Sequence, residues 1–229
     1  MKNIFYSLLC LCIISCENKN NTDIASISLS TDIPTNGLII DQQLLSNIKK
    51  STNKEPIQLN REVWNYDKDG NEENYILDKG LVFKFVNHEK AHAIFNTYSD
   101  KVIEGNNYIF LTNMDFDESY NTYYDIVIID GSDPFELIKR IGTNGVNYDK
   151  YNNDIVLQLK EWHTEVGFKF VVIDVARIHA YMNKLPKNIT QFSTEVYEFC
   201  PDVIDQGYSS MDEMIKDYKD TKYFWLWWD

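Results

Sequence analysis

Residues 123–130 (YYDIVIID) and 168–174 (FKFVVID) are two runs rich in β-branched and aromatic residues, and they decide the fold class. Neither run has the regular apolar and polar alternation of a strand with one solvated face. A third run of this kind, 80–86 (GLVFKFV), precedes a helical pattern. Strands of this type need cover on both faces. We therefore predict an α/β domain with a mixed central sheet flanked by helices, with α+β as the alternative class.

Helical patterns separate these strands. Asn87 is placed to cap a helix over 88–100, and Asp133 with Pro134 opens a helix that continues to residue 140. The remaining predicted elements are a short strand running into a helix over 37–50, strands at 108–112 and 223–228, and helices over 150–165, 175–183, 190–199 and from Ser210. The sheet is thus expected to close on a tryptophan-rich C-terminal strand.

Two acidic segments have two interpretations each. Asp67-Lys68-Asp69-Gly70-Asn71, followed by Glu72 and Glu73, places oxygen ligands at alternate positions as calcium loops do. The same segment is also a strong hairpin signal between 64–66 and 75–77. Asp115, Asp117 and Glu118 form either a cation site or a solvated loop.

Composition restricts the partners of the chain. The 229 residues contain 35 acidic and 22 basic side chains, for a formal charge of −13, and no basic stripe is present. This excludes nucleic acid as a partner, because the phosphate backbone is bound by clustered lysines and arginines. Anionic lipid headgroups would also repel such a surface. The 44% of hydrophobic residues is enough for one ordered domain, which we place at 37–229.

The N-terminus has the pattern of a lipoprotein leader. Residues 1–15 combine a positive start with an apolar stretch that is too short to span a bilayer. Ile13-Ile14-Ser15-Cys16 resembles the lipobox of bacterial lipoproteins, with Cys16 as the lipid attachment residue. Residues 16–36 then form a flexible tether. We expect a protein anchored to a membrane by lipid at the cell envelope; an ordinary secretory leader is the alternative.

Cysteine content follows from this leader. Cys10 and Cys12 are removed with it, so the mature chain keeps Cys16 and Cys200 and forms no intramolecular disulfide. Cys200 is either a small buried apolar residue or a reactive thiol. In the second case His163 or His179 would have to activate it.

His88-Glu89-Lys90-Ala91-His92 fits the H-E-x-x-H pattern. In that pattern two imidazoles one helical turn apart bind zinc, and the glutamate activates a water molecule. A third ligand would come from Glu104, Asp115, Asp117 or Glu118. The alternative is a solvated helix face with no metal.

The C-terminal third carries a family resemblance. Its segments are Thr143-Asn144-Gly145 with Asn147-Tyr148, 159–162 (LKEW), 198–202 (EFCPD), Gln206-Gly207 and Trp227-Trp228-Asp229. In this order they resemble the bacterial family called domain of unknown function 4253, over residues 140–229 and more loosely from Gly80. The resemblance implies an α/β domain ending at this tryptophan-rich strand and implies no activity. A lipobox is not usual in that family.

Several of these residues form a predicted binding cleft, namely Asn144, Gly145, Asn147, Trp162, Cys200, Asp202, Gln206 and Trp228. Indole and amide groups suit a polar ligand, although the tryptophans also fit a core strand. We expect a non-catalytic, lipid-anchored module that binds a protein or a small polar ligand. A basic partner would suit its acidity, as in an immunity-like role. The alternative is an envelope hydrolase that uses metal at His88, Glu89 and His92 or a Cys200 thiol.

Overall fold

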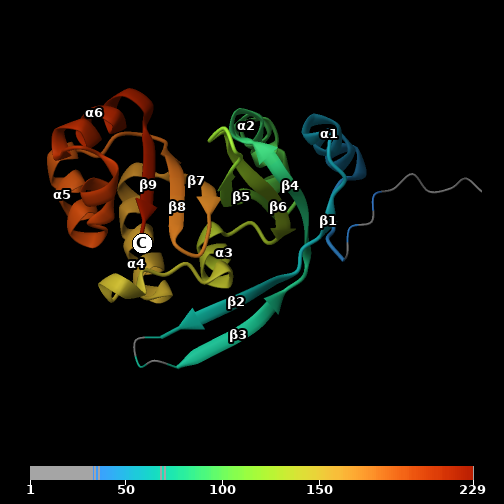
Figure 1. Ribbon diagram of the computed structural model, residues 1–229, viewed down its shortest axis with the longest axis horizontal. Helices are drawn as coiled ribbons and strands as arrows, with labels where there is room; N and C mark the ends of the chain where they lie inside the picture. Colours follow the sequence, from blue (N-terminus) through green and yellow to red (C-terminus); the bar gives the residue numbers. More distant parts are fainter. Residues whose placement is uncertain (1–32, 34, 36, 68, 70, 229) are drawn as a thin grey trace, which may run out of the picture. The chain divides into compact units, whose positions relative to one another are not determined.

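The computed structural model describes residues 33, 35, 37–67, 69 and 71–228, which belong to one compact unit (Figure 1). Its helices are α1 Gln42–Thr52, α2 His88–Glu104, α3 Pro134–Ile141, α4 Asn152–Val166, α5 Ile189–Phe199 and α6 Met211–Thr221, with short helical turns at Val146–Tyr148 and Val203–Gly207. Its strands are β1 Ile57–Gln58, β2 Arg61–Tyr66, β3 Glu72–Leu77, β4 Gly80–Asn87, β5 Asn107–Phe116, β6 Thr122–Asp130, β7 Phe168–Ile173, β8 Arg177–Met182 and β9 Tyr223–Trp227.

Seven strands form one mixed sheet in the order β1-β4-β6-β5-β7-β8-β9. Neighbouring strands are antiparallel except β5 and β7, which run parallel. The strands β4, β5 and β7 therefore point the same way, and their carboxyl ends lie at one edge of the sheet. The remaining two strands, β2 and β3, pair only with each other as a hairpin (Figure 1).

Helices cover both faces of the central strands, as predicted. Ile126 and Ile128 of β6 pack in the core beneath α1 and α2, whereas Val127 and Ile129 pack in the core that α3 to α6 cover. These four side chains are essentially inaccessible to solvent. The uninterrupted apolar run therefore reflects a strand buried on its two sides, which confirms the predicted α/β class and the mixed sheet.

Helix caps also follow the sequence. The Asn87 side chain accepts a hydrogen bond from the Glu89 N–H, and the Asp133 side chain accepts one from the Phe135 N–H. These bonds satisfy backbone donors that have no partner inside the first turn. The predicted helices over 88–100 and 134–140 correspond to α2 and α3.

The helix predicted over 175–183 is wrong, because this segment contains β8. Ile178, Ala180 and Met182 are buried, and the residues between them are half-buried. This period of two is that of a strand with one face in the core. Strand β8 pairs with β9, which closes the sheet at its edge.

The predicted leader 1–15, Cys16 and all of the 16–36 tether except residues 33 and 35 lie outside the described residues. Within the described ranges, no helix is both long enough and apolar enough to cross a membrane.

Candidate functional site

A cleft of about 480 Å³ lies beside the bulges of β4 and β5 and at the carboxyl end of β7, and we call it the strand-end cleft. In open α/β sheets ligands bind near the carboxyl ends of the parallel strands. The hairpin base supplies Ile57, Gln58, Leu59, Asn60, Arg61 and Glu62, and the sheet supplies Val82, Lys84, Thr112, Asn113, Asp125, Val127, Asp174 and Val175. Apolar side chains and charges of both signs therefore meet in one opening.

Arg61 joins the hairpin base to the sheet. Its guanidinium donates to the Asp174 carboxylate at 2.8 Å and to the Thr112 hydroxyl at 2.9 Å. The side chains of Arg61 and Asp174 are only 15% and 11% exposed, so water screens this ion pair poorly. Asp174 also accepts hydrogen bonds from the Asn113 and Val175 N–H groups. The pair is thus fixed from both sides of the cleft.

Asp125 is the second buried carboxylate of the cleft, 8% exposed. One oxygen accepts the Phe85 N–H and the other accepts the Asn113 side-chain amide, both at 2.9 Å. Phe85 and Asn113 sit at bulges in β4 and β5, the two neighbours of β6, and both have left-handed backbone, with φ of 52° and 49°. Such backbone is rare for a residue like phenylalanine and clusters at functional sites.

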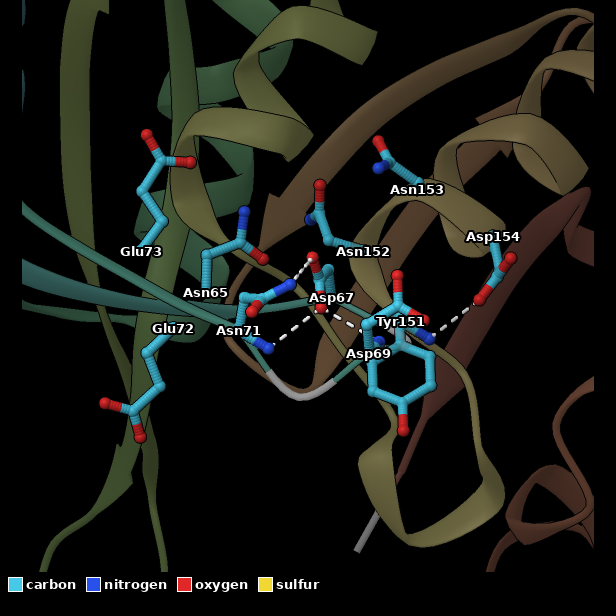
Figure 2. A pocket seen from close by; sticks show the side chains of 10 residues that line it. All are labelled: Asn65, Asp67, Asp69, Asn71, Glu72, Glu73, Tyr151, Asn152, Asn153 and Asp154. Atoms are coloured by element: carbon cyan, nitrogen blue, oxygen red, sulfur yellow. Dashed lines mark hydrogen bonds between the residues drawn. The ribbon is translucent and has the colours of Figure 1, made fainter.

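A second opening of about 670 Å³, the hairpin cleft, lies between the β2–β3 hairpin and the start of α4. Five carboxylates line it, together with four asparagines and one tyrosine: Asp67, Asp69, Glu72, Glu73, Asp154, Asn65, Asn71, Asn152, Asn153 and Tyr151. Figure 2 shows Asp67 at the centre of the turn, with Glu72 and Glu73 directed away from it.

The hydrogen bonds of the hairpin cleft favour the turn over the calcium loop. Asp67 accepts the N–H groups of Asp69 and Asn71 and the Asn71 side-chain amide. Its oxygens thereby hold the turn of the hairpin together. Asp154 accepts the Tyr151 N–H at the start of α4. Lys68 and Gly70 of the predicted loop lie outside the described residues.

Asp117 has the same role in the turn between β5 and β6. It accepts the Ser119 and Asn121 N–H groups and the Asn121 side-chain amide. The Asn121 bonds are the main cause that lowers the pKa of Asp117. Asp115 accepts the Phe116 N–H. The acidic loop is therefore a turn that is held together by the hydrogen bonds that Asp117 accepts.

The H-E-x-x-H pattern places two imidazoles side by side at the start of α2. The ring centroids of His88 and His92 are 4.4 Å apart, and His92 Nδ1 lies 3.2 Å from the Tyr181 hydroxyl. Burial, and secondarily His88, lowers the pKa of His92 to about 4. Glu89 is exposed. Among the described residues, no group of three or more His, Cys, Asp or Glu side chains is arranged to hold a metal ion.

The predicted cleft around the C-terminal tryptophans is largely core. Trp162, Cys200, Asp202 and Trp228 are at most 3% exposed. A Cβ atom on Gly145 would lie 2.6 Å from the Trp228 ring, so this glycine is needed for close packing. A ligand would reach these four side chains only after a rearrangement. The structure brings these four side chains together as parts of the packed core and not as the lining of an open cleft.

The polar members of that prediction lie closer to the surface. Gln206 and Asn147 are exposed, and Gln206 donates to Asp202 at 2.9 Å. The Tyr148 hydroxyl also donates to Asp202, at 2.5 Å. The backbone N–H of Asn144 donates to the Val175 carbonyl at 2.8 Å, and its side-chain amide donates to the Gly142 carbonyl at 3.0 Å.

Cys200 has the surroundings of an unreactive thiol. It is fully buried, and its Sγ lies 3.1 Å from the Trp227 carbonyl. Burial is the main cause that raises its pKa to about 12, so little thiolate forms at neutral pH. His163 accepts the Phe168 N–H, and His179 is hydrogen bonded to Tyr223. The two predicted activating imidazoles are therefore engaged elsewhere.

Comparison with known families identifies the C-terminal part of the chain. Residues 125–229 match the model of a domain of unknown function, DUF4253. This part of the chain is a DUF4253 domain. No curated protein and no solved structure matches the chain. The DUF4253 domain begins at Asp125 and includes Asp174, so both buried carboxylates of the strand-end cleft belong to it.

The threonine-asparagine-glycine turn of the DUF4253 domain holds one wall of this cleft. The Thr143 hydroxyl donates to the Asp174 carbonyl at 2.6 Å, and the Asn144 N–H donates to the next carbonyl, that of Val175. The turn thereby fixes the segment that carries the Asp174 carboxylate. Arg61, Lys84 and Asn113 come from outside the matched residues and complete the site.

Sequence reasoning missed the strand-end cleft. Asp125 was visible only as an acidic residue inside the apolar run 123–130, and Asp174 as the last residue of the run 168–174. A carboxylate inside a buried strand or directly at its end is the signal that could have found them, because a charge there needs partners. Arg61 gives no comparable signal in the sequence.

Proposed function

We propose that this chain is a lipid-anchored binding protein that holds a small polar ligand in the strand-end cleft. The observation that carries the proposal is the pair of buried carboxylates, Asp125 and Asp174, which line one cleft with Arg61 beside the bulges of β4 and β5 and the end of β7. Converging polar groups above an apolar floor, in a volume of this size, are typical of ligand sites.

The arrangement favours binding over covalent catalysis. Arg61 and Asp174 neutralise each other, and two neutral donors fix the orientation of the Asp125 carboxylate. The thiol of Cys200 is buried with a raised pKa, which disfavours a nucleophilic role. The described histidines of the H-E-x-x-H pattern form no three-ligand metal group.

The membrane part of the proposal rests on the sequence alone. The lipobox ending at Cys16 would attach the domain to a membrane that its acidic surface avoids. Replacing Cys16 by Ala in the native host tests it. We expect the wild-type chain in the membrane fraction and Cys16→Ala outside it. An unchanged distribution would contradict the anchor while leaving the cleft untouched.

A thermal-shift experiment tests the ligand site. The full-length protein in detergent is heated with and without the low-molecular-weight extract of its host. A ligand present at about a hundred times its Kd stabilises by about 2.7 kcal/mol, which raises Tm by roughly 5–10 °C for a chain of this size. We expect a smaller rise for Lys84→Gln, at the rim of the cleft, and the full rise for the exposed Lys139→Gln. No rise for the wild type would overturn the proposal.

A further inference from the structure

Asp125 is a buried charge without a cationic partner among the described residues. Its carboxylate accepts hydrogen bonds from two neutral groups, the Phe85 N–H and the Asn113 amide. No described lysine, arginine or histidine forms an ion pair with it. Asp174, of the same burial, is paired with Arg61. Buried carboxylates are normally paired, so Asp125 is the exception in this cleft.

The surrounding backbone is built to present this carboxylate. Both strands that flank β6 bulge beside Asp125, and each bulge contributes one donor to it. Phe85 and Asn113 both adopt left-handed backbone at these bulges, a conformation that a residue as bulky as phenylalanine rarely adopts. Two bulges that fix one carboxylate orient it far better than the sheet alone would.

The rest of the cleft has the chemistry of a short amine site. The side chains of Val82 and Val127 offer apolar contact for a hydrocarbon chain next to the carboxylate. The volume of about 480 Å³ holds a small molecule and not a folded segment. Of the two cations in the lining, Arg61 is already paired with Asp174, and Lys84 lies exposed at the rim.

From this we infer that the strand-end cleft takes a small molecule with a primary ammonium group, which sits on the Asp125 carboxylate. The ligand supplies the positive charge that the described chain does not place there. The inference rests on the proposed function, since it names the ligand class of the same cleft.

Calorimetric titration of the full-length protein with three probes of equal length tests this. The probes are n-pentylamine, n-pentanol and pentanoate, which differ only in their head group. We expect pentylamine to bind at least tenfold tighter than pentanol, and pentanoate to bind no better than pentanol. Because the comparison uses the wild-type chain, it does not depend on how any variant folds.

Variants then locate the ammonium group. Asp125→Asn is expected to weaken the affinity for pentylamine at least tenfold. Glu72→Gln, in the hairpin cleft, should change that affinity less than twofold. Equal binding of pentylamine and pentanol, or an unchanged affinity in a folded Asp125→Asn protein, would overturn the inference. Pentanoate binding that is lost in Lys84→Gln would overturn it too, but would leave the proposed function standing. The proposed function fails separately, if the host extract gives no thermal shift.

Discussion

Replacing Arg61 by Met should destabilise the protein far more than removing an exposed cation. The change leaves the Asp174 carboxylate, 11% exposed, without its ion-pair partner, and it also removes a donor from Thr112. Breaking a fully buried pair costs about 3–5 kcal/mol. Asp174 keeps two backbone donors, so we expect a loss of about 2–3 kcal/mol in the free energy of unfolding.

Lys139→Met is the matched control, because Lys139 pairs with Glu136 on the surface, where the side chains are 39% and 56% exposed. Such pairs contribute at most about 1 kcal/mol. Urea unfolding gives the loss of stability of each variant from the shift of its unfolding midpoint, provided that the slope m is unchanged. Adding Asp174→Asn to Arg61→Met should recover part of the loss, since the unpaired charge disappears. If Arg61→Met lost no more than Lys139→Met, the ion pair would not hold the cleft together.

Three further predictions concern other parts of the chain. Because the folded His92 has a pKa of about 4 and the unfolded one about 6.5, protons bind the unfolded state preferentially below pH 6.5. His92 should therefore contribute about 2 kcal/mol to the loss of stability from pH 7 to pH 5, and His179, whose pKa burial also lowers, adds its own loss. Urea unfolding at each pH should give a loss in His92→Phe that is smaller than the wild-type loss by about 2 kcal/mol. Cys200 should react with iodoacetamide at pH 8 only in denaturant, and labelling of the folded protein within minutes would contradict its burial. Gly145→Ala should cost about 1–3 kcal/mol through contact with Trp228, whereas Gly105→Ala, whose Cβ would meet nothing closer than 3.4 Å, should cost much less in the same assay.

The sheet and its helices were predictable where the local signals agreed. The run at 123–130 was apolar throughout and became a strand buried on both faces, and Asn87 and Asp133 capped the helices they precede. The prediction of a helix over 175–183 was wrong because the spacing of the apolar residues and the strand pairing favour different structures. Val175, Ile178 and Met182 fit a helical spacing, but pairing with β7 and β9 imposes the strand.

The candidate site was not predictable, because its parts are far apart in the chain. Arg61 and Asp174 are 113 positions apart, and only the sheet order brings the hairpin base to the end of β7. The motifs visible in the sequence had structural roles instead. Asp67 and Asp117 close turns, and Trp228 fills the core against Gly145. A motif that is conspicuous in sequence was thus a poor guide to where polar groups converge.

We expect the ligand to bind in the strand-end cleft and not in the acidic hairpin cleft. Amide chemical shifts of the ¹⁵N-labelled protein, recorded during a titration with the host low-molecular-weight extract, distinguish the two clefts. We expect the amide signals of Phe85, Asn113 and Val175 to move together, because these N–H groups hold the walls of the cleft. Shifts confined to Asp69 and to the amides of 71–73 in the hairpin cleft would contradict it.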